Sequence, residues 1–312
     1  MKNIVLLGGS GFIGRKLAVE LSKHHHVVVL DLVTCNEFSG NQNIEFHPFN
    51  FTAPDQDMSV CRDADIVVHL ISTLFPEDGT DRLAADIDKN VLSTIRLLDA
   101  MKTSPAELVF ISSGGTVYGE GSAIPSLETD ALSALCTYSL IKIMIEETIK
   151  LYGHQHGMNY KIIRLSNPYG YNPNTERTQG AIPIFVHRIL NGDPITIWGN
   201  GQNTRDYIYL DDAIDAILQV INASPMQEIF NVGSGISYST MEIIHQIEQH
   251  IGDHPPVNVT FSQSRACDVA DNSLDVHKMK EVLNWSATHS LEDGIKQVIQ
   301  EFKHRQVKTQ QA

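Results

Sequence analysis

Residues 3–14 read Asn-Ile-Val-Leu-Leu-Gly-Gly-Ser-Gly-Phe-Ile-Gly, an apolar run that breaks into regularly spaced glycines. The run predicts a buried strand, and the apolar spacing of residues 12–23 predicts a helix after it. Gly8 allows the tight turn between them, Gly11 lets backbone amides approach a ligand, and Gly14 lets helix and strand pack closely. Phosphates bind at the positive end of such a helix. The segment therefore predicts a strand, a phosphate-binding turn and a helix.

The residue that ends the next apolar run indicates which ligand binds. Residues 27–30 predict a second strand, and Asp31 follows it directly. A carboxylate at this place can bind the ribose hydroxyls of a dinucleotide. The next residues, Leu32-Val33-Thr34, include no arginine, and the carboxylate of Asp31 would repel a 2'-phosphate. We therefore expect NAD rather than NADP; the alternative is a glycine turn that binds no ligand.

The alternation of strand and helix continues along the first half of the chain. Further apolar runs predict strands at 66–71, 108–111 and 160–165, and helical patterns cover 90–101 and 138–152. Continuous apolar runs are typical of strands that are buried on both faces, as in a parallel sheet. We expect an α/β fold, a Rossmann-type doubly wound parallel sheet.

The second half predicts a smaller, interleaved C-terminal substrate lobe. We expect residues 1–166 to form the dinucleotide-binding domain, with about 205–233 returning to it, and 167–204 and 234–305 to form the lobe. Leu283 and Trp285 are expected in the core of that lobe, and the polar residues 306–312 are expected to be a frayed tail.

Composition limits the class of protein. Thirty-seven acidic residues against 23 Lys and Arg give a formal charge of -14, which argues against a nucleic-acid binder. Four widely spaced cysteines indicate a reducing compartment, and no run approaches the length of a membrane span, so we expect a cytoplasmic protein. His24-His25-His26 has no ligand partners at metal-site spacing, and we interpret it as a solvated turn with no metal.

A tyrosine and a lysine suggest acid–base chemistry. Tyr138 and Lys142 stand four residues apart on a predicted helix, so their side chains share one face. A phenol alone is a weak base at neutral pH, and an ammonium group one turn away stabilises its phenolate. The pair follows residues 112–119, Ser-Ser-Gly-Gly-Thr-Val-Tyr-Gly, which leave the carboxyl end of a predicted strand, where doubly wound sheets bind ligands.

These three segments together resemble the extended short-chain dehydrogenase/reductase superfamily. Within it the chain looks most like the NAD-dependent nucleotide-sugar epimerases, with UDP-glucose/UDP-N-acetylglucosamine 4-epimerase as the nearest type. The resemblance covers nearly the whole chain, including the stretch Thr204-Arg205-Asp206-Tyr207-Ile208-Tyr209 and the later Arg265-Ala266-Cys267-Asp268.

The resemblance implies a set of site residues. Tyr138, Lys142, Thr116 and Ser113 would be catalytic. The cofactor would be held by Gly8, Gly11, Phe12, Ile13, Gly14, Asp31, Asn50, Phe51, Leu70, Ile71, Ser72, Asn90, Ser112, Tyr138 and Lys142. The nucleotide sugar, UDP-linked by the same resemblance, would be held by Asn167, Arg205, Arg265, Asp268 and Asn272.

Two positions depart from the family pattern. The resembling enzymes commonly carry Ser or Thr four residues before the tyrosine of the turn, which is Gly114 when counted from Tyr118. The hydroxyl that bonds the sugar must then come from Ser113, from Thr116 or from a water. Asn50 stands where the family usually has Asp beside the adenine, and an amide can still form a hydrogen bond there.

The resemblance also bears on the sugar. In resembling 4-epimerases the position seven residues after the phosphate-binding arginine lies near the C2 substituent of the sugar, and a Tyr there excludes N-acetylated sugars. That position is Asn272, which predicts acceptance of the UDP-GlcNAc/UDP-GalNAc pair; the alternative is that Asn272 only caps a turn.

We expect reversible epimerisation at C4 of a nucleotide-linked hexose through a 4-keto sugar. The alternatives are a 4,6-dehydratase, a keto-sugar reductase and a non-catalytic protein that senses the nucleotide sugar. A dehydratase or decarboxylase typically has carboxylates in the turn, where this chain has Gly115-Thr116. Apolar residues on several sides of the predicted helices, among them Ile141, Ile143, Met144, Ile145 and Ile149, favour a homodimer over a monomer with a thicker core.

Overall fold

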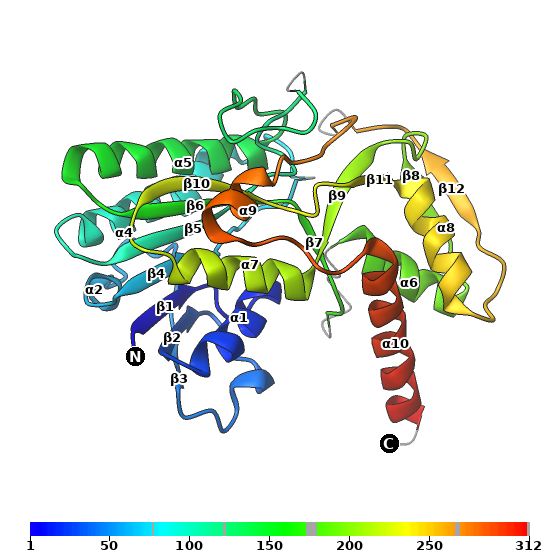
Figure 1. Ribbon diagram of the computed structural model, residues 1–312, viewed down its shortest axis with the longest axis horizontal. Coiled ribbons are helices and arrows are strands. Elements are labelled where there is room, and N and C mark those ends of the chain that lie inside the picture. Colours follow the sequence, from blue (N-terminus) through cyan, green and yellow to red (C-terminus); the bar gives the residue numbers. More distant parts are fainter. Residues whose placement is uncertain (77, 121–122, 173–179, 266–268, 311–312) are drawn as a thin grey trace.

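A large parallel sheet forms the centre of the molecule (Figure 1). The computed structural model describes residues 1–76, 78–120, 123–172, 180–265 and 269–310. The strands of this sheet are β1 (Asn3–Leu7), β2 (His26–Asp31), β3 (Ile44–Pro48), β4 (Ile66–His69), β5 (Glu107–Ser113), β6 (Tyr160–Leu165) and β10 (Gln227–Val232). They lie in the order β10-β6-β5-β4-β1-β2-β3, and every neighbouring pair is parallel. The doubly wound Rossmann-type sheet is confirmed.

Helices cover both faces of this sheet. One face packs against α1 (Phe12–Ser22), α7 (Leu210–Asn222) and α9 (His277–Leu283). The other face packs against α2 (Ser59–Arg62), α4 (Ser93–Met101) and α5 (Thr137–His156), near the short elements α3 (Leu83–Ile87) and η2 (Asp88–Leu92). A 3₁₀ turn, η1 (Asn36–Phe38), follows β2. The continuous apolar strands are therefore buried on both faces, as their sequence predicts.

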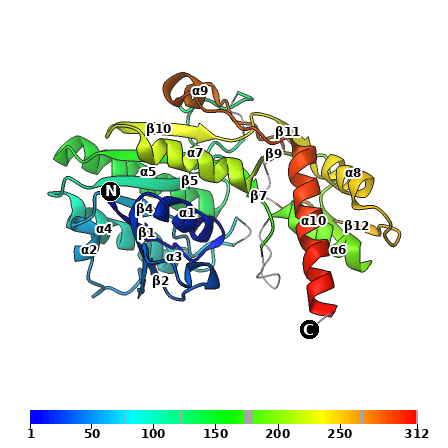
Figure 2. The ribbon, with the colours of Figure 1, turned by 60° about the horizontal axis from the view of Figure 1, so that its bottom comes forward.

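A smaller lobe packs beside the carboxyl ends of the large sheet (Figure 1). Its helices are α6 (Ala181–Asn191), α8 (Thr240–Ile251) and α10 (Leu291–Gln310), and its parallel strand pair is β8 (Ile195–Trp198) with β12 (Val259–Ser262). A third sheet joins β7 (Asn167–Tyr169), β9 (Thr204–Tyr209) and β11 (Ser237–Ser239). Figure 2 shows α10 in front of α6, on the side of the lobe toward the large sheet, leading to the C-terminus.

The structure corrects two details of the sequence interpretation. Trp285 packs with Met279 in the core of the large sheet, and its Nε1 donates to Asp215 on α7 at 2.8 Å, so it is not part of the core of the smaller lobe. The tail predicted to fray from Gln306 continues α10 as far as Gln310.

The edge strand β3 is an element that the sequence pattern did not reveal. Its five residues are exposed or half-buried, because an edge strand has only one strand neighbour. A continuous apolar run is therefore not required there. Among the described helices, none combines the length and the apolar content needed to cross a membrane.

Candidate active site

A cavity of about 1490 Å³ opens where the carboxyl ends of the sheet strands face the smaller lobe. Ligands of doubly wound folds bind at this edge of the sheet. The predicted site residues that line the cavity are Gly8, Gly11, Phe12, Ile13, Gly14, Asp31, Asn50, Phe51, Leu70, Ile71, Ser72, Ser112, Ser113, Thr116, Tyr138, Lys142, Asn167, Arg205 and Arg265.

The glycine turn at the start of α1 has the shape that its sequence predicts. Gly8 has a φ of +83°, which favours glycine, and its N–H donates to the carbonyl of Leu30 at 2.9 Å. A Cβ atom on Gly14 would lie 2.5 Å from the carbonyl oxygen of Gly8. Only glycine at position 14 therefore lets α1 start so close to the strand, and the N-terminus of α1 faces the cavity as a binding place for a pyrophosphate.

The carboxylate at the end of β2 also lies on the cavity wall. Asp31 accepts hydrogen bonds from the backbone N–H groups of Ser10 at 3.0 Å and of Leu32 at 2.7 Å. These bonds fix the carboxylate beside the glycine turn. An oxygen of Asp31 keeps lone-pair capacity for a ribose hydroxyl, since each carboxylate oxygen can accept more than one hydrogen bond.

Asn90 plays a different part from the other residues predicted to hold the cofactor. It is buried and is not on the cavity wall. Its Nδ2 donates to Thr73 Oγ1 at 2.7 Å, and its Oδ1 accepts from the Thr73 N–H at 3.0 Å. Asn90 thus holds in place the loop after β4, which supplies Leu70, Ile71 and Ser72 to the wall.

The start of α5 places Tyr138 and Lys142 against the cavity. Cys136, in extended backbone, caps the helix together with Ser139, so that Tyr138 falls in the first turn. Lys142 is buried and its Nζ donates to the carbonyl oxygen of Ile111 on β5 at 2.8 Å. The same Nζ lies 5.7 Å from the centre of the Tyr138 ring.

Burial changes the proton affinity of both groups. It raises the pKa of Tyr138 to about 12, against which a hydrogen bond with Ser113 acts. It lowers the pKa of Lys142 to about 8, against which the nearby carboxylate of Glu146 acts. The Ser113 hydroxyl therefore favours the phenolate of Tyr138, and a Lys142 ammonium 5.7 Å from the ring would add a positive charge that acts in the same direction.

The turn after β5 carries two hydroxyls to the cavity. The Ser113 hydroxyl forms a hydrogen bond with Tyr138. The Oγ1 of Thr116 is buried and has no hydrogen-bond partner among the described residues. An unpaired buried hydroxyl costs free energy until a ligand satisfies it. The Thr116 hydroxyl thus keeps its hydrogen-bonding capacity unused among the described residues, whereas Ser113 is bonded to Tyr138.

The polar residues of the smaller lobe meet the same cavity. Asn167 donates from Nδ2 to the carbonyl of Asp206 at 2.9 Å, and Arg265 stacks on the Trp198 ring at 5.5 Å. Arg205 lines the cavity from β9. Asp268 lies outside the described residues.

The structure corrects the expectation for Asn272. Its side chain is buried, is not on the cavity wall, and donates from Nδ2 to the carbonyl oxygen of Gly114 at 3.0 Å. The amide nitrogen thus holds the turn after β5 behind the cavity surface, while the buried Oδ1 has no hydrogen-bond partner among the described residues. The argument that Asn272 selects between plain and N-acetylated sugars loses its basis.

The charge of the cavity wall is opposite to that of the whole chain. Among the described residues that line it, the carboxylate is Asp31, whereas the cations are Lys89, Lys142, Arg188, Arg205 and Arg265. In a chain of formal charge -14 this concentration of cations suits a ligand with several phosphates. Over the described residues, no group of His, Cys, Asp or Glu side chains is arranged to hold a metal ion.

A comparison with protein-family models settles the membership of the chain. The model of the NAD dependent epimerase/dehydratase family matches residues 4–233. The chain belongs to this family. The matched part of this epimerase/dehydratase family member holds the glycine turn, Asp31 and the Tyr138–Lys142 pair, while Arg265 lies beyond it.

Relatives match this family member over nearly its whole length. A protein of Methanocaldococcus jannaschii, provisionally named as a UDP-glucose 4-epimerase, is 33% identical and covers 96% of this chain and 98% of its own. The dTDP-4-dehydro-6-deoxyglucose reductase of Escherichia coli is 30% identical, with 97% and 98% covered. A UDP-glucose 4-epimerase of Thermotoga maritima, solved with UDP-glucose, superposes with a TM-score of 0.88 at 27% identity, with 97% and 99% covered.

The residues of this NAD-dependent family member fit the cofactor. Gly8, Gly11 and Gly14 bring the backbone of the turn to the cavity wall without side chains in the way, and Asp31 stands at the second strand with no arginine after it. Sequence reasoning missed Lys89, Arg188 and Trp198, which also line the cavity. Lys89 and Arg188 are single cations in no motif, whereas Trp198 lies in the stretch Ile197-Trp198-Gly199-Asn200-Gly201, which is part of the family resemblance and could have indicated it.

Proposed function

We propose that this protein catalyses reversible epimerisation at C4 of a UDP-linked hexose, either the Glc/Gal or the GlcNAc/GalNAc pair, through a transient 4-keto sugar. The observation that carries the proposal is that Tyr138, Lys142 and the unpaired Thr116 hydroxyl face the same cavity as Arg205 and Arg265. Acid–base groups and diphosphate-binding cations thus share one site.

Each group has a role in this reaction. Tyr138 takes the proton of the 4-hydroxyl, while the Lys142 ammonium and the Ser113 hydroxyl stabilise the phenolate. Thr116 donates a hydrogen bond to the sugar oxygen. When bound, NAD would supply the redox chemistry, as the acceptor and then the donor of the C4 hydride. Arg205 and Arg265 hold the diphosphate while the ketone turns over.

The cavity wall argues against dehydration and decarboxylation. Those reactions need a carboxylate in the turn after β5, and here Gly115 and Thr116 occupy that place. Among the described residues of the cavity wall, Asp31 is the only one with a carboxylate, and it lies at the end of β2 and not in the turn after β5.

A keto-sugar reductase is the second candidate, because the Escherichia coli relative is a reductase of a dTDP-linked sugar. Reduction would consume reduced cofactor, whereas epimerisation returns it unchanged. Asp31 disfavours the 2'-phosphate of NADPH, which supports the epimerase.

The test is to incubate the purified protein with UDP-Glc, UDP-Gal, UDP-GlcNAc and UDP-GalNAc and to resolve the products by NMR. Absorbance at 340 nm is followed in parallel. We expect interconversion of one C4 pair with no net formation or loss of NADH. Stoichiometric consumption of NADH with a 4-keto sugar, without epimerisation, would instead assign a reductase.

We also propose that the protein works in the cytoplasm as a homodimer that contacts its copy through η2 and α5. Leu92 and Leu151 on these elements are 43% and 49% exposed. Ile141, Ile145 and Ile149 are buried within the chain itself, so they give no support to the dimer. Sedimentation velocity of the parent and of a Leu92→Glu/Leu151→Glu variant tests it: a parent monomer would overturn the dimer.

A further inference from the structure

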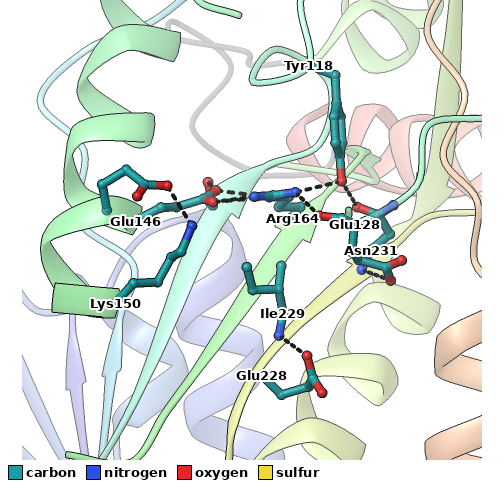
Figure 3. A network of polar contacts seen from close by, with 10 residues as sticks. Tyr118, Glu128, Glu146, Lys150, Arg164, Glu228, Ile229 and Asn231 are labelled. Carbon is teal, nitrogen blue, oxygen red and sulfur yellow. Dashed lines mark hydrogen bonds and ion pairs between the residues drawn. The ribbon is translucent and has the colours of Figure 1, made fainter. Parts of the chain in front are cut away.

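A buried carboxylate stands one helical turn beyond Lys142. Glu146 on α5 has a side-chain exposure of 0%, and Ser112 donates its hydroxyl to Oε1 of this carboxylate. Arg164 on β6 donates from Nε at 3.1 Å and from Nη2 at 2.7 Å to Oε2 (Figure 3). One carboxylate therefore joins α5 to two neighbouring strands at the edge of the sheet that carries the site.

Arg164 also forms hydrogen bonds on the side of its guanidinium that points away from Glu146. Its Nη1 donates to the hydroxyl of Tyr118 at 3.0 Å and to the carbonyl of Glu128 at 2.9 Å. Tyr118 donates in turn to Asn231 Oδ1 at 2.6 Å (Figure 3). The guanidinium is fixed from both sides, so the position of the Glu146 carboxylate is fixed as well.

Burying an ion pair costs desolvation free energy, and the attraction between the two charges offsets only part of it. The pair of Glu146 and Arg164 is therefore not explained by a gain in folding stability alone. Here the pair lies beside a buried lysine. The titratable groups near Lys142 are Tyr138 on α5 and His69 on β4. Glu146 faces the guanidinium of Arg164 on β6 and the neutral hydroxyl of Ser112 on β5. Glu146 brings the negative charge to this group.

The field of Glu146 acts on Lys142 in the direction that catalysis needs. Burial disfavours the ammonium form of Lys142, and the Glu146 carboxylate opposes that effect. The ammonium stabilises the phenolate of Tyr138, so the loss of the carboxylate would leave a smaller fraction of Tyr138 as phenolate at neutral pH. The hydrogen bond from Ser112 also fixes the first residue of the turn that carries Ser113 and Thr116.

We propose that Glu146, clamped between Arg164 and Ser112, is a positioning residue for Lys142, which lies one helical turn before it on α5, and for the turn after β5. The inference rests on the roles proposed above for Tyr138 and Lys142.

The chain offers a matched control for the test. Glu107 and Lys161 form a second buried ion pair between the same two strands, at 2.9 Å, near the amino ends and away from the cavity. Glu146→Gln and Glu107→Gln therefore remove the same charge from the same sheet. Both are expected to unfold at lower temperature, because each leaves a buried cation unpaired.

The readout is the pH dependence with which an amine-reactive reagent labels Lys142, quantified by mass spectrometry in protein without nucleotide sugar. Glu146→Gln should move the labelling midpoint down by about one pH unit, a typical effect of a nearby charge. The alkaline limb of kcat/KM should move in the same direction. Glu107→Gln should leave both in place.

The outcomes separate the inference from the proposed function. An unshifted midpoint in Glu146→Gln makes the pair merely structural and overturns the inference, even if epimerisation is confirmed. A shifted midpoint in a protein that converts no UDP-hexose supports the link between Glu146 and Lys142 and removes the proposed function. If Glu146→Gln does not fold, Arg164→Gln leaves the Glu146 carboxylate without its counter-ion, so the midpoint should move up, and a midpoint equal to the parent's overturns the inference.

Discussion

The side chain of Leu274 fills the space beside Gly114 that a larger residue would need. A Cβ atom on Gly114 would lie 2.5 Å from Cδ1 of Leu274 and 2.8 Å from the carbonyl oxygen of Arg164. The Ser or Thr that resembling enzymes carry at this position therefore has no room here. Two neighbouring residues with hydroxyl groups, Ser113 and Thr116, do line the cavity.

Restoring the usual serine should damage the protein. We expect Gly114→Ser to lower the free energy of unfolding by about 1–3 kcal/mol, because one of the clashing atoms is backbone and cannot turn away. Gly79→Ser is the control, since a Cβ on Gly79 has no atom within 4 Å. Urea unfolding of the parent and both variants measures the difference. Equal stability of the three proteins would contradict the crowding at Gly114.

Thr116 and Ser113 should differ in their effect on turnover. Thr116→Val removes the unpaired hydroxyl and keeps the shape, so we expect kcat to fall about tenfold or more, as when a hydrogen bond made in the transition state is lost. Ser113→Ala removes the partner of the Tyr138 phenol and should shift the acid limb of the pH profile upward. If neither variant loses activity, a water supplies the hydroxyl.

Replacing Tyr138 by Phe should abolish the acid–base step and keep the aromatic ring. We expect kcat to fall by at least about 100-fold, since general acid–base catalysis typically contributes 10²–10⁴. Binding of NAD, measured by calorimetry, should persist because the glycine turn and Asp31 are untouched. Near-parental turnover would remove Tyr138 from the mechanism.

His69 should make stability fall in acid. It is buried between the rings of Phe51 and Phe110, and burial, aided by Lys142, lowers its pKa to about 3. The unfolded chain binds this proton near pH 6.5, so stability present above pH 6.5 is lost as pH falls toward 3.

At pH 5 this loss amounts to about 2 kcal/mol. His69→Phe should lose less stability than the parent between pH 7 and pH 5, as measured by urea unfolding at both values. His24→Gln, a change on the surface, serves as the control. The same loss in the parent and in His69→Phe would show that His69 does not carry it.

The sequence alone predicted much of the fold and of the site. The buried strands, the glycine turn with Asp31 after the second strand, and the shared face of Tyr138 and Lys142 all follow from patterns of short range. Their reason is local: backbone geometry repeats every two residues in a strand and every 3.6 in a helix, so residues near in sequence reveal which face they share. Glu146, four residues after Lys142, could have been found by the same rule.

Only the tertiary structure decided contacts between distant segments. Leu274 excludes a side chain at Gly114, and Asn272 donates a hydrogen bond from Nδ2 to the carbonyl oxygen of Gly114. Trp285 packs in the core of the large sheet. The edge position of β3 likewise depends on the order of strands. Such contacts join residues up to about 160 positions apart, and they follow from how whole elements pack, which no local period encodes.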